Sequence, residues 1–141
     1  MPGDATDPAD FGLPTVSTDY TLCVYDETGN TPSLRLAVSA PAGELCSTRA
    51  CWRETSSGFR YSDRAATPNG LLRLQLESGI AGRARITLKG RGPLLRLPSL
   101  PFVQQGSVIA QLKNGVGKCW EADYSAPAER NDAEGFVDQG D

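Results

Sequence analysis

The stretch that decides the fold is LRLQLESGIAGRARITLK, residues 72–89. In its first half, leucines at every second position alternate with Arg73, Gln75 and Glu77, and its second half alternates in the same way. A period of two residues sends successive side chains to opposite faces of a strand, so each half is predicted to be a half-buried β-strand. Between the halves, Ser78-Gly79 is typical of a turn.

The same alternation recurs through most of the chain. Apolar and polar residues alternate at 20–25, 33–40, 52–54, 59–64, 108–112 and 119–124. Between these segments lie turn residues, such as Asn114-Gly115, whose preferred backbone suits a tight hairpin. The chain also holds 15 Gly and 10 Pro, and no segment has a convincing helical period. We therefore predict an all-β fold, an antiparallel β-sandwich or a jelly-roll-like barrel of about eight short strands.

A chain of 141 residues is long enough for one domain with its own core. Residues 1–19 hold three prolines among small and acidic residues, and we predict an extended N-terminal tail there. The β-sandwich domain is expected to span 20–126. An acidic C-terminal tail, 127–141, would follow, with room for a last strand at Phe136-Val137.

Four cysteines and no histidine are the most informative feature of the composition. Four cysteines allow three pairings. We predict Cys46–Cys51, which closes a small local loop, and Cys23–Cys119, which joins the first strand to the last long one. Zinc binding is the alternative, but the spacing is not that of zinc modules. Two disulfides would place the protein in an oxidising compartment, so we expect it to be secreted, outside the cell or on its surface.

The missing histidine removes the side chain most used for proton transfer near neutral pH, and with it any Ser-His-Asp or Cys-His site. Glu121 and Asp123 share one strand face, as two carboxylates of a glycosidase could, but any exposed strand gives that spacing. We predict no catalytic residue, no cofactor and no metal ligand. Asp26, Glu27, Asn30 and residues 131–134 offer oxygen ligands for Ca²⁺, but they match no EF-hand loop, and solvated turns are the default.

Charge is strongly segregated along the chain. Residues 1–30 carry six acids and no base and 119–141 carry seven acids and one base, whereas 31–118 carry thirteen bases and four acids. The net charge is −3. We expect the acidic ends to lie near the basic middle in one fold, or else to attract the basic middle of another copy. The densest basic cluster, a candidate site for a polyanion or a protein partner, is Arg83, Arg85, Lys89, Arg91 and Arg96.

Trp52 and Trp120 each follow a cysteine. An exposed aromatic platform would suit sugar stacking, so these two residues, with Tyr25 and Tyr61, are the candidates for glycan binding. The strand period places both tryptophans in line with inward positions, however, which favours a role in the core. Tyr25, Tyr61 and Tyr124 are predicted to lie at the rim of the fold.

Several short runs follow one another in a recognisable order: Cys23-Val-Tyr-Asp26, Thr31-Pro-Ser-Leu34, Cys51-Trp52, Gly58-Phe-Arg-Tyr-Ser-Asp63, Cys119-Trp-Glu-Ala122 and Arg130-Asn-Asp132. Together they resemble an uncharacterised accessory module, often C-terminal, that recurs in large secreted proteins of environmental bacteria. The resemblance covers most of 20–138. It implies an extracellular accessory or surface domain and brings no catalytic residues with it.

These observations predict a non-enzymatic extracellular module for structure, adhesion or assembly, which would associate with itself through its tail and its segregated charge. The alternative is a glycan- or polyanion-binding accessory domain of a secreted protein. Expected partners are other copies, another extracellular protein or a glycan. The acidic overall balance argues against nucleic acid, and no apolar run approaches the roughly 20 residues that span a bilayer.

Overall fold

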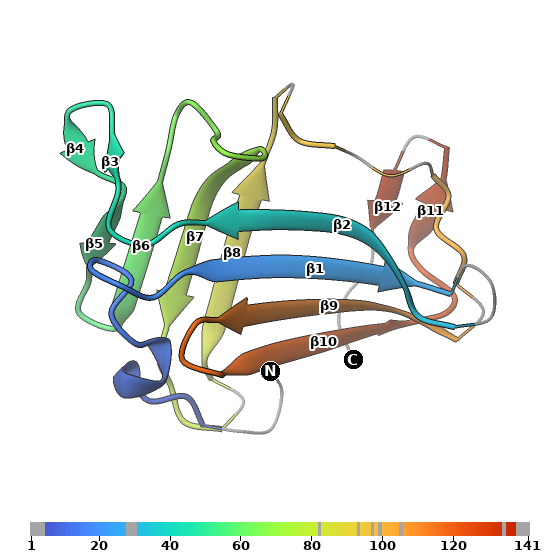
Figure 1. Ribbon diagram of the computed structural model, residues 1–141. Coiled ribbons are helices and arrows are strands. Elements are labelled where there is room, and N and C mark those ends of the chain that lie inside the picture. The colour runs from blue at the N-terminus through green and yellow to red at the C-terminus, as the bar shows by residue number, and fades with distance from the viewer. Residues whose placement is uncertain are drawn as a thin grey trace.

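Two four-stranded antiparallel sheets form most of the molecule (Figure 1). The structure is a computed structural model that describes residues 5–27, 31–81, 83–92, 94–96, 98, 100–104, 106–133 and 135–137. The first sheet has the order β10-β9-β1-β2, with β1 Tyr20–Asp26, β2 Ser33–Ala40, β9 Ser107–Asn114 and β10 Cys119–Ser125. The second has the order β5-β6-β7-β8, with β5 Trp52–Glu54, β6 Gly58–Ser62, β7 Leu71–Glu77 and β8 Arg85–Gly90.

Two small hairpins complete the sheet structure of the described residues. They are β3 Leu45–Cys46 with β4 Arg49–Ala50, and β11 Arg130–Asp132 with β12 Gly135–Val137. The all-β, antiparallel prediction is confirmed, and the eight segments predicted from alternation are the eight strands of the two large sheets. Strands β3, β4 and β11 were missed; β3 and β4 have two residues each, which is too few to show a period. Phe136-Val137, where a last strand was expected, belongs to β12.

The two sheets share one core. In Figure 1 the strands of the first sheet run across those of the second, and the buried side chains of both belong to a single cluster. Aromatic rings form its centre, with neighbouring ring centroids 5.3–6.5 Å apart. They make a continuous series through both sheets, in the order Tyr61, Trp52, Tyr20, Trp120, Phe11 and Phe59.

The N-terminal segment is part of this core, so the prediction of an extended tail over 1–19 is wrong for residues 5–19. A short 3₁₀-helix, η1 Pro8–Phe11, places Phe11 between Phe59 and Trp120, where it is fully buried. The Tyr20 hydroxyl donates a hydrogen bond of 2.8 Å to the carbonyl of Phe11. Thr6 forms an antiparallel bridge to Gly79 beside β7. The buried side chains of Thr6, Phe11, Pro14 and Thr18, together with these hydrogen bonds, fix a segment whose composition resembles that of a flexible tail.

The predicted Cys23–Cys119 disulfide is absent, and both residues are free thiols. Cys23 lies opposite Gln111 on β9, whereas Cys119 lies opposite Lys113 on the other side of that strand. With β9 between them, the two cysteines are separated by two strand spacings, about 10 Å, which exceeds the roughly 7 Å that a disulfide allows between Cα atoms. The predicted Cys46–Cys51 bond is present, across the β3–β4 hairpin.

Replacing Phe11 with alanine should lower the free energy of unfolding by about 3–5 kcal/mol, because the cavity would open in the shared core. Val16, in the same segment but 70% exposed, provides the control: Val16→Ala should change stability by less than about 0.5 kcal/mol. Urea unfolding measures both. Equal, small effects would mean that the N-terminal segment does not dock on its own domain.

Alkylation followed by mass spectrometry should count the thiols in three steps. The native protein should take one label, at exposed Cys119; the unfolded, unreduced protein should take two; and the reduced protein should take four. An unfolded, unreduced chain that takes no label would restore the rejected second disulfide.

Candidate anion-binding surface

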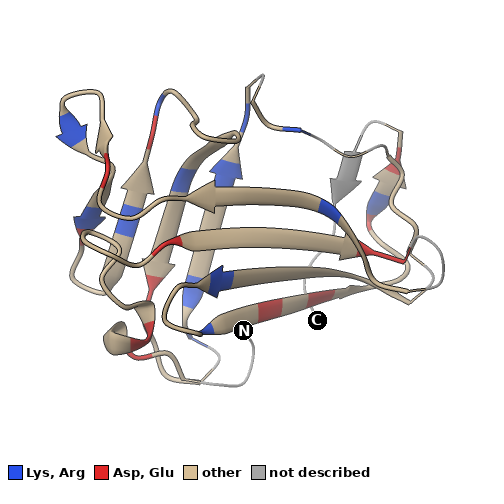
Figure 2. Cartoon of the chain, viewed as in Figure 1, with Lys and Arg blue, Asp and Glu red and all other residues tan. Residues whose placement is uncertain are grey.

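The outer face of the second sheet is densely basic. Alternation buries one side of its strands against the core and turns the other outward, and Lys and Arg occur on all four strands (Figure 2). We call the outward bases of this sheet the cationic face: Arg53, Arg60, Arg73, Arg85 and Lys89. The only acidic residue among the outward positions of these strands is Glu77. This face therefore has a strong excess of positive charge.

Strand pairing places like charges directly opposite each other. Arg53 on β5 lies opposite Arg60 on β6, and Arg73 on β7 lies opposite Lys89 on β8. Opposed residues on one face have Cβ atoms about 4.5–5.5 Å apart, and like charges at that distance destabilise a sheet. Folding gains nothing from these two pairs. An anion lying over the sheet would remove the repulsion in both.

Carboxylates of the protein do little to neutralise the face. Glu77 lies opposite Arg85, and it also accepts a hydrogen bond of 3.2 Å from the Gln75 side chain. Within the described part of the chain, the ion pairs closer than 4.0 Å involve Arg35, Lys118 and Arg130, none of which belongs to the face. The guanidinium groups of the face are therefore available to an external partner.

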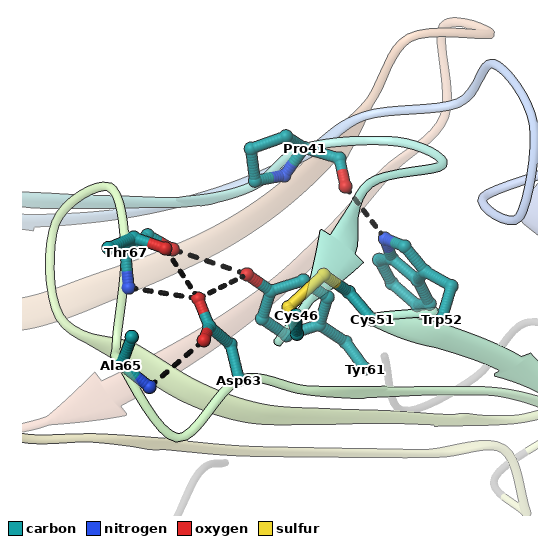
Figure 3. The surroundings of a disulfide bond; sticks show 8 residues. All are labelled: Pro41, Cys46, Cys51, Trp52, Tyr61, Asp63, Ala65 and Thr67. Carbon is teal, nitrogen blue, oxygen red and sulfur yellow. Dashed lines mark hydrogen bonds between the residues drawn. A yellow bond between two sulfur atoms is a disulfide. The ribbon is translucent and has the colours of Figure 1, made fainter. Parts of the chain in front are cut away.

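A groove opens beside the β5 edge of this face. Its volume is about 990 Å³, and its walls are the β3–β4 hairpin and the turn that follows β6, residues 46–51 and 62–65, together with Arg53. Arg53 belongs both to the groove and to the cationic face, so the two surfaces are continuous. The Cys46–Cys51 disulfide closes the hairpin next to Trp52 and Tyr61 (Figure 3).

The one carboxylate among the groove residues is already engaged. Asp63 is 4% exposed and accepts hydrogen bonds from the backbone N–H of Ala65 at 3.0 Å, the backbone N–H of Thr67 at 3.0 Å and the Thr67 hydroxyl at 2.6 Å (Figure 3). Burial acts to raise the pKa of Asp63, but the hydrogen bonds from Thr67, Ala65 and Tyr61 together outweigh it and lower that pKa below its usual value. Asp63 is thus an ionised anchor of the 63–67 turn.

The aromatic residues predicted to stack on a glycan do not form a platform. Trp52, Trp120 and Tyr61 are 2%, 8% and 1% exposed, so the stacking role is wrong for all three, and so is the rim position of Tyr61. The indole N–H groups donate inside the fold, from Trp52 to the carbonyl of Pro41 and from Trp120 to the hydroxyl of Thr6. These rings pack in the core because inward strand positions are the most buried sites available.

The remaining two tyrosines are half-buried and belong to the first sheet. Tyr25 lies on β1 and Tyr124 on β10. Neither lies on the cationic face or lines the groove. The tyrosines therefore add no stacking surface beside the basic residues.

The basic cluster predicted from the sequence is exposed but only partly assembled. Arg85 and Lys89 lie on the cationic face, and Arg83 and Arg91 lie in the loops just before and after β8. Arg96 lies in the following loop and lines a smaller hollow with Ala37, Pro68, Asn69 and Leu94. The sequence reading missed Arg53, Arg60 and Arg73, because only strand pairing brings these distant positions together. The sequence does contain a signal for them: in successive strands, these arginines occupy positions that alternation turns away from the core.

The oxygen-rich turns considered for Ca²⁺ hold loops in place. The carboxylates of Asp26 and Glu27 accept hydrogen bonds from backbone N–H groups of residues 103, 106 and 107. Asn131 bonds the backbone of Phe102 in both directions. Asn30 and Glu134 lie outside the described residues. In the part of the chain that the structure covers, no three His, Cys, Asp or Glu side chains gather as a metal site would require.

Glu121 and Asp123, the two carboxylates weighed for hydrolysis, are exposed on β10 of the first sheet. Neither lines the groove. Over the described residues there is also no helix with the length and apolar character needed to cross a membrane.

Comparison with known proteins returns no match: no family model, no curated protein and no solved structure is significantly similar to this chain.

Neutralising one member of an opposed pair should stabilise the fold. Arg73→Gln should raise the free energy of unfolding by about 0.2–1 kcal/mol, because it removes the repulsion from Lys89. The gain should shrink as salt screens the wild-type pair. Lys113→Gln, at an exposed position opposite the uncharged Cys119 and Thr21, is the matched control and should change stability little. A loss of stability in Arg73→Gln alone would contradict the repulsion.

Proposed function

We propose that this chain is a non-enzymatic extracellular binding module that attaches to an anionic polymer through its cationic face. The observation that carries the proposal is the pair of opposed cations, Arg53 with Arg60 and Arg73 with Lys89. A surface that costs stability in the free protein is expected where binding requires it, because function and stability then compete.

The chemistry of the face supports an anionic partner in two further ways. Four of its five bases are arginine, whose planar guanidinium can bind a carboxylate or sulfate through two parallel hydrogen bonds. The same face offers neutral polar groups between the cations, at Ser62, Gln75 and Thr87. A partner that carries both anionic and hydroxyl groups suits this combination.

The extracellular location is a separate part of the proposal. It is supported by the Cys46–Cys51 disulfide, because such bonds persist in oxidising surroundings and are rare where thiols are kept reduced. The two free thiols weaken this support, since a secreted domain usually pairs its cysteines.

Self-assembly remains the second candidate, and a different surface favours it. Glu121 and Asp123 are exposed on β10, which is an edge strand of the first sheet, so a second copy could present them to the cationic face. The version in which the N-terminal segment is lent to a neighbour loses its support, because residues 5–19 pack on their own domain.

The test is binding of heparin, a sulfated uronic acid polymer, at low and moderate salt. Wild-type protein should bind, with an affinity that falls as salt rises. Arg73→Gln should weaken binding by about fivefold and reduce the salt dependence, whereas Lys113→Gln, which loses the same charge on the opposite sheet, should change little. Equal weakening by the two variants, or no binding at low salt, would contradict the proposal.

Sedimentation velocity separates the second candidate from the first. Concentration-dependent dimers that dissociate in salt, and that Arg73→Gln or Glu121→Gln removes, would favour self-assembly over a foreign polymer. A monomer at every concentration that still binds heparin supports the proposal.

A further inference from the structure

The groove beside the cationic face has the size and position of a subsite. Its volume of about 990 Å³ lies at the upper end of the roughly 300–1,000 Å³ range of ligand pockets. It begins at β5, the edge strand of the second sheet, where Arg53 joins it to the face. A polymer crossing the strands of that sheet would therefore reach the groove at one end.

The groove combines positive charge with hydroxyl groups. Three arginines line it, Arg49, Arg53 and Arg64, and all three are exposed. Hydroxyl groups come from Ser47, Thr48 and Ser62. No aromatic residue lines it, so it lacks the flat ring on which a neutral sugar or a nucleobase would stack. A ligand must be held here by an anionic group and by hydrogen bonds.

Two local interactions constrain the backbone segments that carry Arg49 and Arg64. The Cys46–Cys51 bond, with Cα atoms 4.9 Å apart, closes the hairpin that carries Arg49. Asp63 fixes the turn that carries Arg64 through its hydrogen bonds to Ala65 and Thr67. Constraining loops before binding reduces the entropy lost on binding.

We propose that the groove binds one acidic sugar unit, a uronate or a sulfated hexose, of a polysaccharide that lies across the cationic face. Arg49, Arg53 and Arg64 bind its anionic group, and the serine and threonine hydroxyls bind its ring hydroxyls. This inference rests on the proposed function and names the polymer as an acidic polysaccharide. Nucleic acid is the less favoured polyanion, because neither the groove nor the cationic face exposes an aromatic ring for stacking.

The test is an NMR titration of labelled protein with a sulfated uronic acid disaccharide cut from heparin, a ligand too short to cover the sheet. Amide shifts should concentrate in residues 46–51 and 62–65. The double variant Arg49→Gln/Arg64→Gln should weaken disaccharide binding by about tenfold. Lys113→Gln, on the other sheet, should leave disaccharide binding within about twofold, because that position belongs neither to the groove nor to the cationic face. Dispersed spectra of each variant establish that it is folded.

The outcomes separate the groove from the face. Disaccharide-induced shifts centred on β7 and β8, or undiminished disaccharide binding by the double variant, would contradict the proposed binding site in the groove. Heparin binding by the cationic face would be unaffected by that result. Heparin binding that is no tighter than disaccharide binding, and that Arg73→Gln leaves unchanged, would keep the groove and overturn the proposed function. Equal affinity for an uncharged disaccharide, or tighter binding of a single-stranded oligonucleotide, would contradict the proposal that the ligand is an acidic polysaccharide.

Discussion

The series of ring contacts through the core is the constraint on which the rest of the structure depends. It begins in the second sheet at Tyr61 and Trp52, crosses to Tyr20 and Trp120 in the first, and returns through Phe11 to Phe59. Aromatic pairs contribute through the large area they bury and through their preferred edge and offset geometries. Because these rings join both sheets and the N-terminal segment, they fix which face of each strand points inward. The opposite faces are thereby turned to solvent.

That division explains where the charge of the molecule lies. The inward face of the second sheet is held by the core, so its outward arginines and lysine have no freedom to avoid each other by a change of pairing. A one-residue slip would expose the leucines and bury the bases. The core thus maintains a repulsive surface that strand pairing alone would disfavour. This is the physical basis for our proposal that the cationic face serves binding rather than stability.

Of the two predicted disulfides, only the local one, Cys46–Cys51, is present. The chain was expected to need a long-range bond between its first and last long strands, yet Cys23 and Cys119 lie on either side of β9 and remain free. The bond that does form closes a hairpin of two-residue strands, which has little else to hold it. It lies beside the groove, so its main effect falls on the shape of that surface.

Period-two alternation by itself determined the fold class, the eight strands of the two large sheets and the inward position of both tryptophans, because these depend on which residues can share one face of a strand. The sequence alone also predicted the local disulfide, because Cys46 and Cys51 are close together in the chain. Only the tertiary structure decided the pairing of strands far apart in the chain. That pairing kept Cys23 from Cys119 and brought Arg53, Arg60 and Arg73 beside Arg85 and Lys89. The packing of η1 and of both sheets around one core buried Phe11 and Tyr61. The physical reason is that alternation specifies which side chains of a strand share one face, but carries no information on which other strand pairs with that strand.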